Sequence, residues 1–122
     1  MTIMPPLRLV VIESPYRATQ ERSQEQHRAY LLHCLADSIG RGENPYASHH
    51  LLTEVLNDDV PMERALGIQA GWSWGAHADA VAVYRDLGIS PGMAASIEHY
   101  KVLGKPIEYR SIDQRLVLAV CG

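Results

Sequence analysis

Apolar residues along this chain fall into short unbroken runs separated by longer segments of mixed polarity. The runs at residues 7–12 and 80–84 are almost continuously aliphatic or β-branched, without alternation of polar and apolar positions. This pattern is typical of strands buried on both faces, as in the centre of a parallel sheet. Shorter runs at residues 44–48, 106–109 and 115–121 predict further strands.

The intervening segments predict helices. One begins near Thr19 or Ser23 and ends at Ile39, before two glycines. A short helix is expected at residues 50–56, another from Pro61 to about Gly75 or His77, and a last one at 93–103 before Gly104. Apolar residues at three- and four-residue spacing predict the faces turned to the core. These are Ala29, Leu32, Leu35, Ala36 and Ile39 in the first helix, and Met62, Leu66, Ala70 and Trp74 (or Ser73) in the third.

Strands that alternate with helices predict an α/β fold with a mostly parallel sheet and helices on both faces. The 122 residues suffice for one domain, 1–122, and not for two. A formal net charge of −3 argues against a protein that coats nucleic acid. We expect no membrane span and no secretory signal, and Cys34 and Cys121 as reduced thiols in a cytoplasmic protein.

Three of the expected loops leave the carboxyl ends of strands, where parallel sheets bind ligands. The loop Ser90–Met93 opens a helix, so free backbone N–H groups and the helix dipole favour an anion there. An ordinary capped helix would have the same sequence, with Ser90 as N-cap. The predicted ligand-binding residues are Ser14, Pro15, Tyr16, Arg17, Ser48, His49, Ser90, Gly92, Met93 and Ser96.

Carboxylates near these loops are the candidates for acid–base chemistry. They are Glu13, Asp79, Asp86 and Glu98, of which we select Asp86 and Glu98 as catalytic candidates. Glu98 could equally be a solvated helix residue paired with Lys101. We expect no metal site, because neither His49 nor His50 has a partner at zinc-ligand spacing, and no cofactor.

The order of the segments resembles the nucleoside 2-deoxyribosyltransferase-like superfamily, and within it a branch of small uncharacterised bacterial and phage proteins. The resemblance covers roughly residues 7–112 and is carried by the segments at 12–18, 44–49, 58–68, 84–93, 97–98 and 104–110. It implies a flavodoxin-like, Rossmann-like three-layer sandwich with four to five strands, a homo-oligomer, and a pocket for a deoxynucleoside or nucleoside monophosphate.

In the active members of that superfamily a glutamate after the Gly-rich loop attacks the anomeric carbon. The position that matches it here is Ser96. Two function classes therefore stay open. One is an enzyme that cleaves or transfers at the N-glycosidic bond of a deoxynucleotide. The other is a non-catalytic nucleotide sensor, or a sponge that sequesters a nucleotide signal, as in conflict between phage and host. A scaffold that acts only through protein contacts is a third reading.

Overall fold

One four-stranded parallel sheet forms the middle layer of the computed structural model, which describes residues 7–121. The strand order is β2-β1-β3-β4 and every neighbouring pair runs parallel. The order reverses between β1 and β3, so the loops that leave these two strands diverge to opposite sides of the sheet. The strands are β1 Arg8–Glu13, β2 Glu43–Tyr46, β3 Ala80–Tyr84 and β4 Ile107–Arg110.

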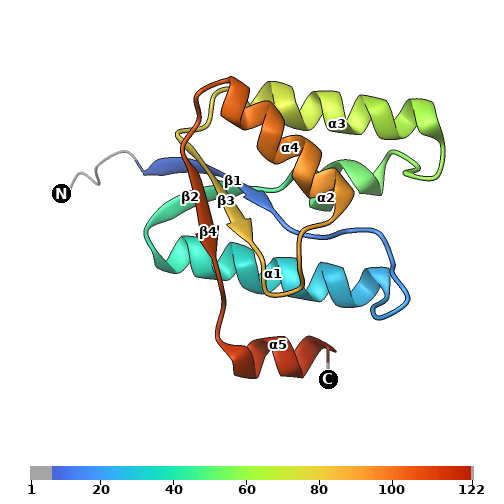
Figure 1. Cartoon of the computed structure of the whole chain (residues 1–122), viewed down its shortest axis with the longest axis vertical. Helices are drawn as coiled ribbons and strands as arrows, with labels where there is room; N and C mark the ends of the chain where they lie inside the picture. The colour runs from blue at the N-terminus through green and yellow to red at the C-terminus, as the bar shows by residue number, and fades with distance from the viewer. Residues whose placement is uncertain (1–6, 122) are drawn as a thin grey trace.

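Helices cover both faces of the sheet (Figure 1). One face carries α1 Gln24–Gly40 and α5 Gln114–Cys121, and the other carries α3 Pro61–Gly75 and α4 Pro91–Val102. A short helix, α2 Ser48–Leu51, continues into the 3-10 turn η1 Leu52–Glu54. The expected three-layer α/β fold of the Rossmann or flavodoxin-like kind is confirmed.

Alternate residues of the two central strands supply two separate cores. Val10 and Ile12 pack with Tyr30, Leu31 and Cys34 under α1, whereas residues 11, 81 and 83 pack with Met93, Ile97 and Tyr100 under α4. Every residue of β3 is buried. This two-sided burial explains why the sequences of β1 and β3 lack polar alternation.

A buried ion pair also lies on the α1 face. The guanidinium of Arg110 donates to both carboxylate oxygens of Glu43, at 2.7 and 2.8 Å, and Ser38 Oγ donates to the same carboxylate at 2.8 Å. These bonds hold the pKa of Glu43 down, at about 2. The pair ties the start of β2 to the end of β4 across the sheet.

The strand expected at residues 115–121 is wrong, because this segment forms α5. Asp113 caps it, accepting a bond from the Arg115 N–H at 2.8 Å. As a helix, the segment turns Val117 and Val120, three residues apart, onto the core under α1. Its β-branched composition suggested a strand, but helical spacing fits the surface that it covers.

The inner face expected for α3 is also wrong, and that expected for α1 is wrong in part. Leu35 packs against the core as expected, but Leu32 and Ile39 are exposed, and the buried side chains of α1 are His27, Tyr30, Leu31, Cys34 and Ser38. In α3 the stripe Met62, Leu66 and Trp74 faces solvent. This helix approaches its neighbours through glycines instead, because an ideal Cβ at Gly71 would overlap Ser48, and one at Gly75 would overlap the Tyr100 side chain. Small residues permit this close contact, and the bulky apolar ones are turned outward.

Among residues 7–121, none of the helices combines the length and the apolar character that crossing a bilayer requires.

Candidate functional site

A cleft of about 490 Å³ opens at the carboxyl ends of β1 and β3, at the point where the strand order reverses. One wall is the loop after β1 and the other is the loop after β3 together with the start of α4. The two loops singled out in the sequence therefore meet in one cleft. Its lining includes Pro15, Tyr16, Arg17, Arg22, His27, Asp58, Arg64, Leu87, Ile89, Ser90, Pro91 and Gly92.

Local sequence fixes the start of α4 at this cleft. Ser90 is the N-cap, and its Oγ accepts a hydrogen bond from the Met93 N–H at 3.2 Å. Pro91 occupies the first turn, where its missing N–H costs least. None of the hydrogen bonds found within the described part of the chain uses the Gly92 N–H. The helix thus presents a free amide and the positive end of its dipole to the cleft.

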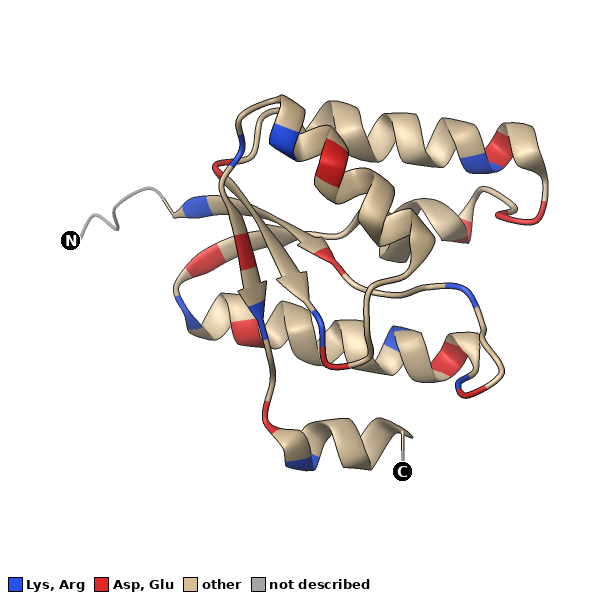
Figure 2. Cartoon of the chain, in the orientation of Figure 1, with Lys and Arg blue, Asp and Glu red and all other residues tan. Residues whose placement is uncertain are grey.

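Two arginines from different segments, Arg17 and Arg64, line the same cleft as this helix start. Arg17 Nε and Arg64 Nη1 each lie 2.8 Å from the same oxygen of Asp58, Oδ2. An ideal Cβ on Gly92 would lie 3.6 Å from Arg64 Nη2, so this guanidinium is next to the first turn of α4. Basic and acidic residues therefore lie close together where the loop after β1 approaches the start of α3 (Figure 2). In this structure both guanidinium groups are paired with the Asp58 carboxylate.

The structure also brings together Ser14 and His49, with Ser14 Oγ 2.8 Å from His49 Nε2. Burial, together with the neighbouring His50, lowers the pKa of His49 to about 4, so the imidazole is neutral at pH 7. Ser48 and His49 line a smaller cavity of about 70 Å³, which shares Asp58 and Arg64 with the main cleft. Ser14, Ser48 and His49 are therefore not among the residues that line the cleft between the β1 and β3 loops.

Glu13, the last residue of β1, has the most perturbed carboxyl at this end of the sheet. Burial raises its pKa to about 8, and an interaction with the Ser96 hydroxyl offsets part of the rise. Ser96 Oγ in turn accepts a bond from Trp72 Nε1 at 3.0 Å. No Lys or Arg in the described residues forms an ion pair with Glu13. Neither Glu13 nor Ser96 is among the residues that line the cleft. A carboxyl that keeps its proton at neutral pH is nevertheless a group suited to acid–base chemistry.

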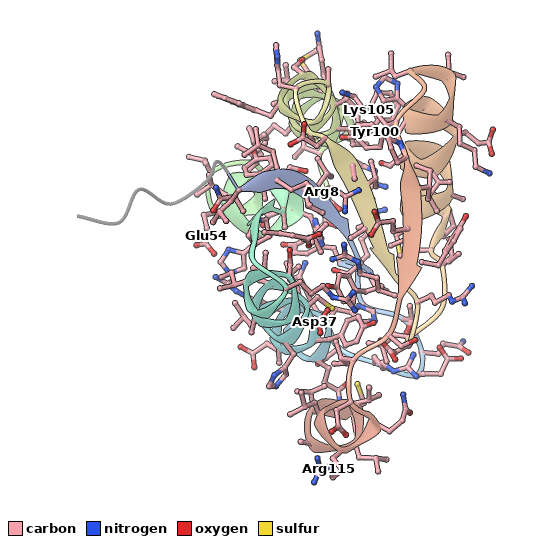
Figure 3. All side chains as sticks on the ribbon, turned by 90° about the vertical axis from the view of Figure 1, so that its left-hand side faces the viewer. Arg8, Asp37, Glu54, Tyr100, Lys105 and Arg115 are labelled. Atoms are coloured by element: carbon pink, nitrogen blue, oxygen red, sulfur yellow. The ribbon has the colours of Figure 1, made fainter. Side chains whose placement is uncertain are left out.

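Tyr100 lies near Glu13, between α3 and α4 (Figure 3). Its hydroxyl donates to the Gly71 carbonyl at 3.4 Å. Burial and the negative charge that Glu13 acquires on ionisation both raise the pKa of Tyr100. The region around Glu13 and Ser96 is thus bounded by neutral groups, one helical turn along α4 from Gly92.

The two catalytic candidates chosen from the sequence do not line this cleft. The Asp86 carboxylate accepts bonds from Tyr30 Oη at 2.5 Å, from the Ile112 N–H at 3.1 Å and from Gln114 at 3.2 Å, which anchor the segment before α5. The Glu98 side chain is 75% exposed and lies 3.7 Å from Lys101. Of the predicted ligand-binding residues, Met93 packs into the core under α4.

The sequence did not predict Asp58 and Arg64 as site residues, nor Glu13 as the carboxyl with the raised pKa. Asp58 and Arg64 lie six residues apart within the segment 58–68, which was one of the segments that carried the family resemblance. Their opposite charges on either side of a predicted helix start could have indicated an ion pair near the cleft. Within residues 7–121, no group of three or more His, Cys, Asp or Glu side chains is placed to hold a metal ion.

Comparison with known proteins yields a family but no described relative. No curated protein and no solved structure matches the chain. A family model described as "Domain of unknown function (DUF7768)" matches residues 8–110, which include all four strands, α1 to α4 and both walls of the cleft. This small three-layer α/β protein therefore belongs to the DUF7768 family.

Proposed function

We propose that the cleft binds a nucleotide-like small molecule through its phosphate. The observation that carries the proposal is that Arg17, Arg64 and the free Gly92 amide line the same cleft, with both arginines held on one oxygen of Asp58. Two guanidinium groups beside a helix start provide charge-assisted hydrogen bonds that match phosphate geometry. The resemblance of the sequence to nucleoside 2-deoxyribosyltransferases, carried in part by the segments that contain these residues, implies the same ligand class.

The rest of the cleft suits the sugar and base of such a ligand. Its volume of about 490 Å³ falls in the range of about 300–1,000 Å³ found for small-molecule sites. Tyr16, Leu87 and Ile89 supply aromatic and aliphatic surface, and His27 and Ser90 supply polar groups. Charged side chains make up much of the remaining lining, which suits a ligand that carries a phosphate: Arg17, Glu21, Arg22, Asp58 and Arg64.

Isothermal titration calorimetry with 5′-dAMP, 5′-dCMP and adenosine tests the proposal. We expect the monophosphates to bind, adenosine to bind more weakly, and Arg64→Gln to lose affinity. Arg28→Gln is the matched control, because Arg28 pairs with Glu54 on the surface, outside the residues that line the cleft. Failure of every monophosphate to bind the wild-type protein contradicts the proposal.

A second function, cleavage or transfer at the N-glycosidic bond, is favoured by the carboxyl of Glu13. It lies beside Ser96, the position where the resemblance implies a nucleophilic glutamate, and it keeps its proton at pH 7. Glycosidic bonds are cleaved with carboxyl groups as acids or nucleophiles. Incubation with deoxynucleoside monophosphates should release free base in the wild type and not in Glu13→Gln.

The alternative is a sensor or sponge that binds a nucleotide-derived signal without changing it. Intact ligand recovered after tight binding, with no base released from any nucleotide, selects this alternative over the enzyme. Asp86→Asn and Glu98→Gln should leave base release unchanged if Glu13 is the reacting carboxyl. We further propose a cytoplasmic location, in which the two cysteines, both free in the structure, stay reduced.

A further inference from the structure

The Asp58 carboxylate lies between Arg17 and Arg64, two of the three arginines that line the cleft. Asp58 Oδ2 receives both Arg17 Nε and Arg64 Nη1 at 2.8 Å, and the Asp58 backbone carbonyl accepts a third bond from Arg17 Nη2 at 3.0 Å. The Asp58 side chain is 20% exposed and lines the cleft itself. Any anion that uses both guanidinium groups must meet this carboxylate.

Resting on the proposed function, we propose that Asp58 is a built-in competitor in the phosphate site, and that the site therefore selects phosphate monoesters, which displace its carboxylate. The positive groups of this phosphate site are the guanidinium groups of Arg17 and Arg64, and the Gly92 amide lies beside Arg64. Both arginines have long side chains that are one-third to one-half exposed, so they can follow an incoming anion.

Charge decides which ligand can replace the carboxylate. A phosphate monoester carries about −1.5 to −2 charges at pH 7 and three strong acceptor oxygens, against one charge and two oxygens for Asp58. A phosphodiester carries one charge, no more than Asp58 itself. A monoester can therefore bind both guanidinium groups and the helix start together, whereas a diester gains nothing by displacing Asp58.

The alternative role for Asp58 is positioning, in which it holds the two arginines ready for the ligand. The two roles predict opposite signs for one substitution. If Asp58 competes with the ligand, its removal frees the two arginines and tightens phosphate binding, because the phosphate no longer has to displace a carboxylate. If Asp58 instead positions the two arginines, its removal makes them more mobile and weakens phosphate binding.

Calorimetric titration of Asp58→Asn with 5′-dAMP, inorganic phosphate and 3′,5′-cyclic dAMP decides between these roles. We expect the dissociation constant for 5′-dAMP to fall at least about fivefold, the lower end of typical coupling between sites. The cyclic diester should bind Asp58→Asn and not the wild type. Asp59→Asn is the control: it removes the same charge from a side chain that is 91% exposed and lies 3.4 Å from Arg17.

Asp58→Ala provides a second, independent test on the same site. Acetate at millimolar concentration should replace the missing carboxylate and weaken 5′-dAMP binding to Asp58→Ala, while leaving binding to the wild type unchanged. Circular dichroism and urea unfolding show that each variant is folded.

Weaker or unchanged 5′-dAMP binding in Asp58→Asn overturns the inference while leaving the proposed function intact. Binding of 5′-dAMP to Asp58→Asn but not to the wild type also overturns the inference, because the monoester then fails to displace the carboxylate. If neither protein binds any phosphate, the proposed function fails and the inference fails with it. Equal tightening in Asp59→Asn would assign the effect to net charge and also contradict the proposal.

Discussion

Replacing Glu13 by Gln should make the protein more stable at alkaline pH. Burial raises the pKa of Glu13 from 4.5 to about 8, so the folded protein holds a proton that the unfolded chain loses between these values. The folded state binds more protons over this window, and the free energy of unfolding therefore falls as the pH rises. Gln keeps the shape of the neutral acid and does not titrate.

The magnitude follows from the size of the shift. Each unit of pKa shift corresponds to about 1.4 kcal/mol, so ionisation of Glu13 costs at most about 5 kcal/mol of stability above pH 8. His49 acts in the opposite direction: its pKa is lowered from 6.5 to about 4, so stability rises with pH in that range. The two effects offset one another up to pH 6.5, and the loss due to Glu13 appears alone between pH 6.5 and 8.

Urea unfolding at pH 5, 6.5, 8 and 9 measures the effect. We expect wild type to lose about 2 kcal/mol between pH 6.5 and 8, and Glu13→Gln to lose little over the same interval. Glu98→Gln, a change of the same kind at an exposed carboxylate on α4, should stay within about 0.5 kcal/mol of wild type. A Glu13→Gln variant that follows the wild-type pH profile would refute the assignment of a neutral carboxyl to Glu13.

Three further substitutions probe the frame around the cleft, each measured by urea unfolding at pH 7. Gly75→Ala should destabilise the protein by about 1–3 kcal/mol, because the added Cβ would lie 2.7 Å from Cζ of the buried Tyr100. Gly40→Ala is the control and should not destabilise, because no atom lies within 4 Å of its Cβ position. Equal effects of the two substitutions would contradict the packing described for α3. Glu43→Ala should cost about 1–3 kcal/mol, because the buried Arg110 loses two hydrogen bonds and keeps only Glu108 as an ion-pair partner; a loss below 1 kcal/mol would show that the Glu43–Arg110 pair is replaceable. Ser90→Ala should cost about 1 kcal/mol and weaken 5′-dAMP binding by fraying the start of α4; unchanged binding would remove that helix start from the site.

Much of the fold follows from the local sequence. The unbroken apolar runs of β1 and β3 predict two-sided burial, and the structure buries Val10–Ile12 and all of β3. The helix expected at residues 93–103, with Ser90 as its candidate N-cap, is α4, which begins two residues earlier at Pro91 and is capped by Ser90. Such features depend on residues close in sequence, so a single chain suffices to reveal them.

The face that a helix turns to the core, and the side chains that meet at the cleft, depend on parts of the chain that are distant in sequence. The outward turn of Trp74 follows from the fit of Gly71 and Gly75 against Ser48 and Tyr100, which no periodicity of α3 encodes. For the same reason the two loops at the cleft were predictable as strand ends, whereas the position of Arg64 beside Gly92 was not. The pKa of Glu13 likewise depends on helices that lie more than 50 residues away in the sequence.

The central claim is that the cleft between the β1 and β3 loops holds the phosphate of a nucleotide. The most direct test is a titration of the ¹⁵N-labelled protein with 5′-dAMP, followed by two-dimensional amide spectra. We predict saturable shifts at the amides of Arg17, Arg64 and Gly92, with residues 114–121 of α5 unmoved. Shifts confined to α5 or the start of the strands, or no shift at any concentration of 5′-dAMP, would contradict the account.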